Sequence, residues 1–141
     1  MRGLFFSGTP DESPRAPKAP RVLVVDDNKD QVLTLVAILR DEGYETKGAY
    51  SGREALASLN EFDPDAVIAD IAMPGMTGWE LAKHVRKWGD ETRPFMIAIS
   101  GEYRQAADRT LAQMVGFNHY LTKPCAPDTV LALLQPLKAP R

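Results

Sequence analysis

The chain of 141 residues has one cysteine, Cys125, only two histidines and no long apolar run. One cysteine forms no intrachain disulfide, and without a cluster of cysteines and histidines the sequence offers no zinc site. No apolar segment approaches the roughly 20 residues that a membrane-spanning helix requires. The apolar run Leu4-Phe5-Phe6 is far too short for a secretory signal. We therefore expect a cytoplasmic protein without a membrane partner.

An excess of basic charge is also missing. The chain has 17 lysine and arginine residues against 19 aspartate and glutamate residues, a formal net charge of −2. Residues 1–21 are slightly basic, so the remainder is mildly acidic and has no basic stripe. Binding to a phosphodiester backbone depends on clustered lysines and arginines. Direct binding of nucleic acid is therefore disfavoured.

Proline is concentrated before the first apolar segment. Four of the eleven prolines lie in residues 7–20, which contain almost no apolar side chains. Such a segment buries too little surface to offset the entropy lost on ordering. We predict a flexible, proline-rich leader over residues 1–20, a single domain over residues 21–138 and a short tail over residues 139–141. A proline-rich docking ligand is the alternative for the leader.

Five short apolar segments alternate with helical patterns inside this domain. The segments predict strands over residues 21–26, 44–50, 66–70, 95–100 and 117–122. The central strands are continuously apolar, as in a parallel sheet that is covered on both faces. We therefore predict an α/β protein, a three-layer α/β/α sandwich around a five-stranded parallel sheet.

Capping signals mark where the helices begin. Asn28 with Gln31 indicates the start of the first helix, and the motifs Ser51-Gly-Arg-Glu54 and Thr77-Gly-Trp-Glu80 predict capping boxes for the second and third. In the fourth helix, Ala107, Leu111 and Met114 recur before Gly116, which predicts its end. Pro127 suits the first turn of the fifth helix, which runs through Leu134.

Polar residues mark the carboxyl ends of four of these strands. Asp26 and Asp27 end the first strand, Asp70 the third and Ser100 the fourth, and Lys123 follows the fifth. Sites in open parallel sheets form beyond the carboxyl ends of the strands, so we expect these side chains to meet at one edge. The sequence therefore predicts a site of three acids, one hydroxyl and one amine.

Electrostatics restricts what such a site can do. Two carboxylates about 5 Å apart repel by roughly 3 kcal/mol at an effective dielectric near 20, so three of them need a proton or a cation. Oxygen ligands of this kind favour Mg²⁺, for which Asp26 and Asp27 are the candidate ligands. A cation, Lys123 and the Ser100 hydroxyl around one carboxylate suit a phosphoryl group. Asp70 is the candidate nucleophile.

These fragments, in this order, resemble the receiver domain of two-component response regulators over about residues 20–138. The matching segments are Val24-Val25-Asp26-Asp27-Asn28, Asp70-Ile-Ala-Met-Pro-Gly-Met-Thr-Gly78, Ile99-Ser100-Gly101 and Tyr120-Leu-Thr-Lys-Pro124. The resemblance implies a flavodoxin-like strand order, 2-1-3-4-5. It fits either a stand-alone regulator or a receiver from a hybrid histidine kinase.

The resemblance also implies the chemistry of the site. Asp70 corresponds to the phosphoacceptor, which takes a phosphoryl group from a histidine kinase or a histidine phosphotransfer protein. Asp26 and Asp27 correspond to the Mg²⁺ carboxylates, and Asp70 and the backbone carbonyl of Ala72 to further ligands. Lys123 corresponds to the lysine that contacts the phosphoryl group.

Two further residues correspond to a conformational switch. Ser100 matches the switch hydroxyl, and Tyr120 matches the switch aromatic, although simple packing also explains a tyrosine in a strand. The family implies a cis peptide bond before Pro124. It also implies a downstream protein effector, which binds the surface made by the fourth helix, the fifth strand and the fifth helix.

Two other function classes remain as alternatives. A pseudo-receiver would keep the fold and bind proteins without phosphorylation. An aspartate-based phosphatase would require a second acid two residues after the nucleophile, where this chain has Ala72. We therefore expect a chain that transfers phosphoryl groups to itself and is not a turnover enzyme. For Cys125, a small packing residue is favoured over a redox-sensitive thiol.

Overall fold

A computed structural model of the protein describes residues 19–101 and 106–138. The strands are β1 (Arg21–Val25), β2 (Glu45–Ala49), β3 (Ala66–Asp70), β4 (Phe95–Ser100) and β5 (His119–Thr122). The helices are α1 (Lys29–Asp41), α2 (Gly52–Phe62), α3 (Gly78–Trp88), α4 (Ala106–Val115) and α5 (Pro127–Leu134), followed by the 3-10 helix η1 (Gln135–Lys138).

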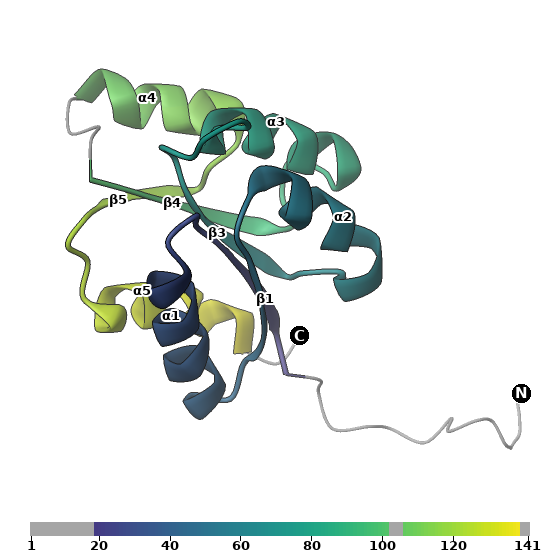
Figure 1. Ribbon diagram of the computed structural model, residues 1–141, viewed down its shortest axis with the longest axis vertical. Helices are drawn as coiled ribbons and strands as arrows, with labels where there is room; N and C mark the ends of the chain where they lie inside the picture. Colours follow the sequence, from purple (N-terminus) through teal and green to yellow (C-terminus); the bar gives the residue numbers. More distant parts are fainter. Residues whose placement is uncertain (1–18, 102–105, 139–141) are drawn as a thin grey trace, which may run out of the picture.

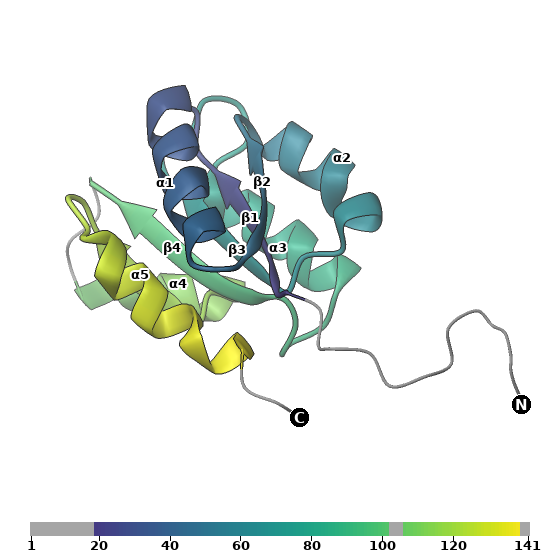
Figure 2. The same cartoon turned by 90° about the horizontal axis from the view of Figure 1, so that it is seen from below.

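The strands form one parallel sheet in the order β2-β1-β3-β4-β5. Helices α1 and α5 cover one face of this sheet, and α2, α3 and α4 cover the other (Figure 1). Figure 2, turned by a right angle, shows α1 and α5 lying in front of the sheet. The predicted three-layer sandwich and its strand order are therefore confirmed.

Alternation along the central strands divides the interior into two cores. In β1, Leu23 and Val25 pack with α2, α3 and α4, whereas Val22 and Val24 pack with α1 and α5. All four side chains are at most 3% exposed. Successive side chains of a strand point to opposite faces, so a strand covered on both faces is apolar throughout. This pattern explains the continuous apolar runs in the sequence.

The predicted capping signals are present with one difference. Asn28 accepts a hydrogen bond from the Gln31 N–H at 3.1 Å, and Thr77 and Glu80 form a complete capping box. At α2, Ser51 accepts from the Glu54 N–H, but the Glu54 carboxylate accepts from the N–H of Tyr50. The predicted box at α2 is therefore only half formed, because the carboxylate reaches one residue further back.

The fourth helix is present, but the sequence pattern did not predict its buried face. Leu111 and Met114 are 41% and 78% exposed, whereas Ala112 is buried and packs with Phe117 in the core between the sheet and α2, α3 and α4. The small Ala112 side chain lies in the core and Val115 packs against it, whereas Leu111 and Met114 lie on the outer side. The recurrence of Leu111 and Met114 therefore does not mark the buried face of α4.

The fifth strand is shorter than predicted, since it begins at His119 and not at residue 117. The Asn118 side chain accepts from the Met96 N–H, and the Asn118 N–H donates to the Met96 carbonyl. These bonds replace the regular ladder at the start of the strand.

The predicted leader and tail lie largely outside the described residues. Of residues 1–20, only 19 and 20 are described, and residues 139–141 are not. The Pro20 carbonyl accepts a hydrogen bond from the Glu45 N–H at the start of β2. Within the described ranges, no helix has the length and apolar character needed to cross a bilayer.

Helix α3 begins directly against the end of β3. A Cβ atom on Gly78 would lie 2.5 Å from the Asp70 carbonyl oxygen and 2.7 Å from the Ile71 Cα. Both neighbours are backbone atoms, which have little room to move. The glycine therefore permits the close contact that fixes the backbone of Asp70.

We expect Gly78→Ala to destabilise the protein by about 1–3 kcal/mol, because the added methyl group overpacks a backbone contact. Urea denaturation measures the change. Gly101→Ala is the matched control, since a Cβ there meets only Lys123 side-chain atoms, the nearest at 3.7 Å. Equal stability of the two variants would contradict the packing argument.

Candidate functional site

Three carboxylates meet at the carboxyl edge of the sheet. Asp26 and Asp27 follow β1, and Asp70 is the last residue of the neighbouring strand β3. One carboxylate oxygen from each lies within 4.8 Å of the others. Asp26 and Asp70 are 8% and 7% exposed, whereas Asp27 is exposed. The structure thus brings together the three acids that the strand ends predicted.

Lys123 places a positive charge inside this cluster. Its Nζ atom lies 3.1 Å from Asp26 Oδ2 and 3.6 Å from Asp70 Oδ1. Its backbone N–H donates to the Ser100 carbonyl at the end of β4, and this bond holds the loop after β5 against the sheet. The peptide bond between Lys123 and Pro124 is cis, as the resemblance implied.

Gln31 is a contact of the site that the sequence reasoning missed. Its Oε1 atom accepts a hydrogen bond from Lys123 Nζ at 2.9 Å. Its backbone N–H is bonded to Asn28, so the start of α1 fixes the position from which the side chain reaches the lysine. The sequence identified Gln31 only as part of a helix start, and spacing alone carries no signal for a contact across 92 positions.

Burial and crowding raise the pKa of Asp70 from 3.8 to about 6. Desolvation is the largest cause, and the charges of Asp26 and Asp27 act in the same direction. The Lys123 ammonium and a hydrogen bond from the Ala72 N–H partly offset them by favouring the charged form. Without a divalent cation, a substantial fraction of Asp70 is therefore protonated near pH 6.

The two predicted switch residues lie on β4 and β5. Ser100 is fully buried and pairs in register with Thr122 of β5. Tyr120 is 6% exposed, with its side chain in the core that α4 covers. The Arg109 guanidinium of α4 lies 5.6 Å from the Tyr120 ring centroid and donates to the Tyr120 carbonyl. The contacts of Arg109, which the sequence did not indicate, link α4 to the tyrosine.

The donor atoms at this edge suit a hard divalent cation. Asp26, Asp27 and Asp70 contribute three negative charges when ionised, and Lys123 contributes one positive charge. The four side chains together therefore have a net charge of −2. Carboxylate oxygens are the ligands that Mg²⁺ prefers, and the exposure of Asp27 leaves room for coordinated water. Ala72, the predicted carbonyl ligand, follows Asp70 by two residues, and its N–H contacts that carboxylate.

A cavity of about 670 Å³ adjoins this edge. Asp26, Asp70 and Lys123 line it at one end, and it continues between α1 and the start of α5. Cys125 lines the same cavity and is half-buried, and desolvation raises the pKa of its thiol. A thiol with a raised pKa is mostly protonated at neutral pH, which agrees with a packing role.

Comparison with known proteins gives a consistent result. The family model of the response regulator receiver domain matches residues 22–135. An uncharacterised 14.6 kDa protein of Leptolyngbya boryana is 41% identical over 115 residues, which cover 81% of this chain and 86% of the relative. Protein PilH of Pseudomonas aeruginosa is 30% identical over 119 residues, which cover 84% of this chain and 98% of that protein.

Solved structures show the same likeness. The chemotaxis protein CheY4 of Vibrio cholerae has a TM-score of 0.77 and is 34% identical, covering 84% of this chain and 98% of that one. A CheY-like receiver domain protein of Methanospirillum hungatei also has a TM-score of 0.77 at 27% identity, covering 84% and 93%.

The raised pKa predicts that Asp70→Asn stabilises the protein at neutral pH in the absence of divalent cations. An ionised Asp70 opposes folding, and a shift of about two pH units corresponds to at most about 3 kcal/mol. The gain is expected to appear as the pH rises from 3.8 through 6, and to vanish below that range, where the carboxyl group is protonated in both states.

Urea denaturation in a chelating buffer across this pH range measures the effect. Asp128→Asn, at an exposed position in the first turn of α5, is the control for loss of one negative charge. A gain for Asp70→Asn that does not depend on pH would contradict the assignment of the strain to the ionised carboxylate.

Proposed function

Because this chain belongs to the family of response regulator receiver domains, we propose that it is a phosphoacceptor switch in a phosphorelay. The phosphoryl group comes from a phosphohistidine of a histidine kinase or a histidine phosphotransfer protein, and Asp70 accepts it. The observation that carries the proposal is the meeting of three carboxylates and one ammonium group at the carboxyl edge of the sheet.

Asp70 is the nucleophile of this reaction. An oxygen of its carboxylate bonds to the phosphorus atom as the bond between phosphorus and the imidazole nitrogen of the donor breaks. The electron pair of the broken bond returns to the imidazole, which leaves as the product. Later attack of water on the acyl phosphate releases inorganic phosphate and restores the carboxylate. The fixed backbone around Gly78 keeps this nucleophile at the strand end.

The surrounding residues offset the charge of the phosphoryl group. Lys123 Nζ, already 3.6 Å from Asp70, contacts a phosphoryl oxygen, and the Ser100 hydroxyl contacts another. Asp26, Asp27 and the Ala72 carbonyl hold Mg²⁺ together with Asp70. Mg²⁺, when bound, supplies positive charge to the phosphoryl oxygens. The raised pKa of Asp70 is compatible with this proposal, since it reflects burial of the carboxylate first and the negative charges of Asp26 and Asp27 second.

The same proposal assigns the output to a downstream protein effector. Ser100 and Tyr120 act as the switch, and the surface of α4, β5 and α5 is the one that responds. The contacts of Arg109 with the Tyr120 ring and carbonyl support this assignment, because they join α4 to β5 at the tyrosine.

We expect the chain to form an acid-stable, base-labile phosphoryl adduct when incubated with a small phosphodonor and Mg²⁺. Asp70→Asn abolishes the adduct, since the amide oxygen is a far poorer nucleophile than a carboxylate. Phosphate-affinity electrophoresis and intact-protein mass spectrometry measure the labelled fraction.

Asp128→Asn, on the exposed surface of α5, is expected to label like the unchanged chain. Equal labelling of Asp70→Asn would show that another residue is the acceptor. No labelling of the unchanged chain by any donor, together with binding of a partner that is the same with and without phosphodonor, would favour the pseudo-receiver.

We expect Mg²⁺ to bind to the chain, and Asp27→Ala to weaken this binding by at least about tenfold, because a carboxylate ligand is lost. Calorimetric titration measures the affinity, and the fluorescence of Trp79, which follows Gly78, gives a second readout. Asp30→Ala is the matched control, because Asp30 lines the same cavity outside the acidic cluster. Undiminished affinity in Asp27→Ala would remove Asp27 from the metal site.

A further inference from the structure

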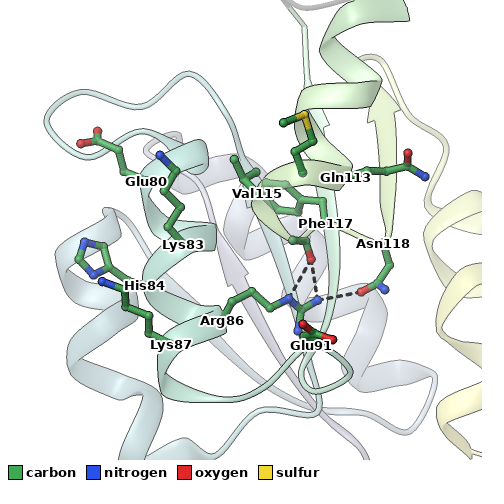
Figure 3. A pocket seen from close by; sticks show the side chains of 12 residues that line it. Glu80, Lys83, His84, Arg86, Lys87, Glu91, Gln113, Val115, Phe117 and Asn118 are labelled. Carbon is green, nitrogen blue, oxygen red and sulfur yellow. Dashed lines mark hydrogen bonds between the residues drawn. The ribbon is translucent and has the colours of Figure 1, made fainter.

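A second pocket, of about 800 Å³, lies between α3 and the C-terminal end of α4 (Figure 3). We call it the α3–α4 groove; its walls include Lys83 and Lys87 of α3, and Gln113 and Met114 of α4. None of its lining residues lines the cavity beside Asp70. The groove is therefore separate from the acidic site.

A clamp centred on Arg86 holds the floor of the groove. Its guanidinium group donates to the backbone carbonyls of Gly116, Asp90 and Pro94 and to the Asn118 side chain. Figure 3 shows the Arg86 side chain of α3 hydrogen-bonded to Asn118 in the segment before β5. Because these bonds use all five donor hydrogens of the arginine, the groove has a fixed floor before any ligand binds.

The wall formed by α3 carries two lysines. Lys83 and Lys87 are exposed and one helical turn apart, a spacing of like charges that disfavours the helix. Within residues 19–101 and 106–138, neither lysine forms an ion pair. Glu80, one turn before Lys83, is committed to the capping box with Thr77. The groove therefore offers two ammonium groups to an incoming anion.

The opposite wall adds an apolar contact. Met114 is 78% exposed and lines the groove, and Leu111, one turn earlier on α4, is 41% exposed. A flexible methionine adapts to many apolar side chains and is common at peptide-binding surfaces. The exposed Met114 side chain and the two lysines together match a ligand that has both carboxylates and apolar side chains.

We propose that the α3–α4 groove binds an acidic polypeptide segment of a partner protein, with carboxylates against Lys83 and Lys87 and an apolar side chain against Met114. Phosphate-rich ligands fit less well, since the Arg86 guanidinium has no donor left for a phosphate. Glu80 and Glu91 also line the groove, so a ligand with a few carboxylates placed against the two lysines fits better than one with continuous negative charge. The binding requires no chemistry at Asp70.

The test uses the full chain, labelled with ¹⁵N and kept free of phosphodonor. The probe is a short fluorescein-labelled peptide in which glutamates flank a leucine-phenylalanine pair. Controls are the same peptide with lysines for glutamates, and a single-stranded oligonucleotide. Fluorescence anisotropy measures the affinity, and amide chemical shifts locate the bound peptide.

We expect shift changes along α3 and the C-terminal half of α4. Lys87→Glu weakens binding about fivefold or more, and higher salt weakens it further. Lys47→Glu, an exposed lysine on β2, is the matched charge control and leaves the affinity nearly unchanged. Met114→Ser weakens binding about threefold or more, whereas Leu33→Ser, at an exposed position on α1, does not.

Several results would overturn the proposal. These are absence of binding at millimolar peptide, shift changes confined to other elements, equal losses in Lys87→Glu and Lys47→Glu, and binding of the lysine peptide. Preferential binding of the oligonucleotide in the groove would assign the surface to nucleic acid instead. Since no phosphodonor is present, each of these outcomes leaves the role of Asp70 unaffected.

Discussion

Repulsion among three carboxylates at one edge of the sheet is the constraint on which the rest of the structure depends. Asp26, Asp27 and Asp70 bring three negative charges within 4.8 Å of one another, and Lys123 offsets only one of them. Burial of Asp70 and, after it, the neighbouring negative charges raise the pKa of its carboxyl group. A protein keeps such an arrangement only if its backbone holds the acids in place, and here the two cores on either side of the sheet do so.

The features around the acids serve either to position them or to balance their charge. Gly78 permits the start of α3 to lie against the Asp70 backbone, and the Asn28 N–H donates to Asp26. Gln31 and Asp26 together hold the ammonium of Lys123 at the edge. A site with two excess negative charges favours binding of a divalent cation. In the proposed function, this cation offsets the negative charge of the site and of the phosphoryl group on Asp70.

The sequence predicted those parts of the structure that depend on local pattern or on topology. Strand ends carry Asp70 and Lys123 to one edge because all five strands run parallel, so the site could be found without side-chain geometry. Contacts set by packing were not predictable. Gln31 reaches Lys123 only because α1 lies beside the loop after β5, and Met114 faces outward whereas the smaller Ala112 lies in the core.

The clamp formed by Arg86 has a consequence for how the molecule can move. It ties the end of α3 to the segments that enter β4 and β5, which lie at the amino edge of the sheet. The acids occupy the opposite edge, where the Lys123 ammonium joins the loop after β5 to Asp26 and Gln31. The residue that follows α4, Gly116, is thus bonded to α3 at the edge of the sheet that lies away from the acids, so the C-terminal end of α4 has less freedom to shift than a helix end without such a bond.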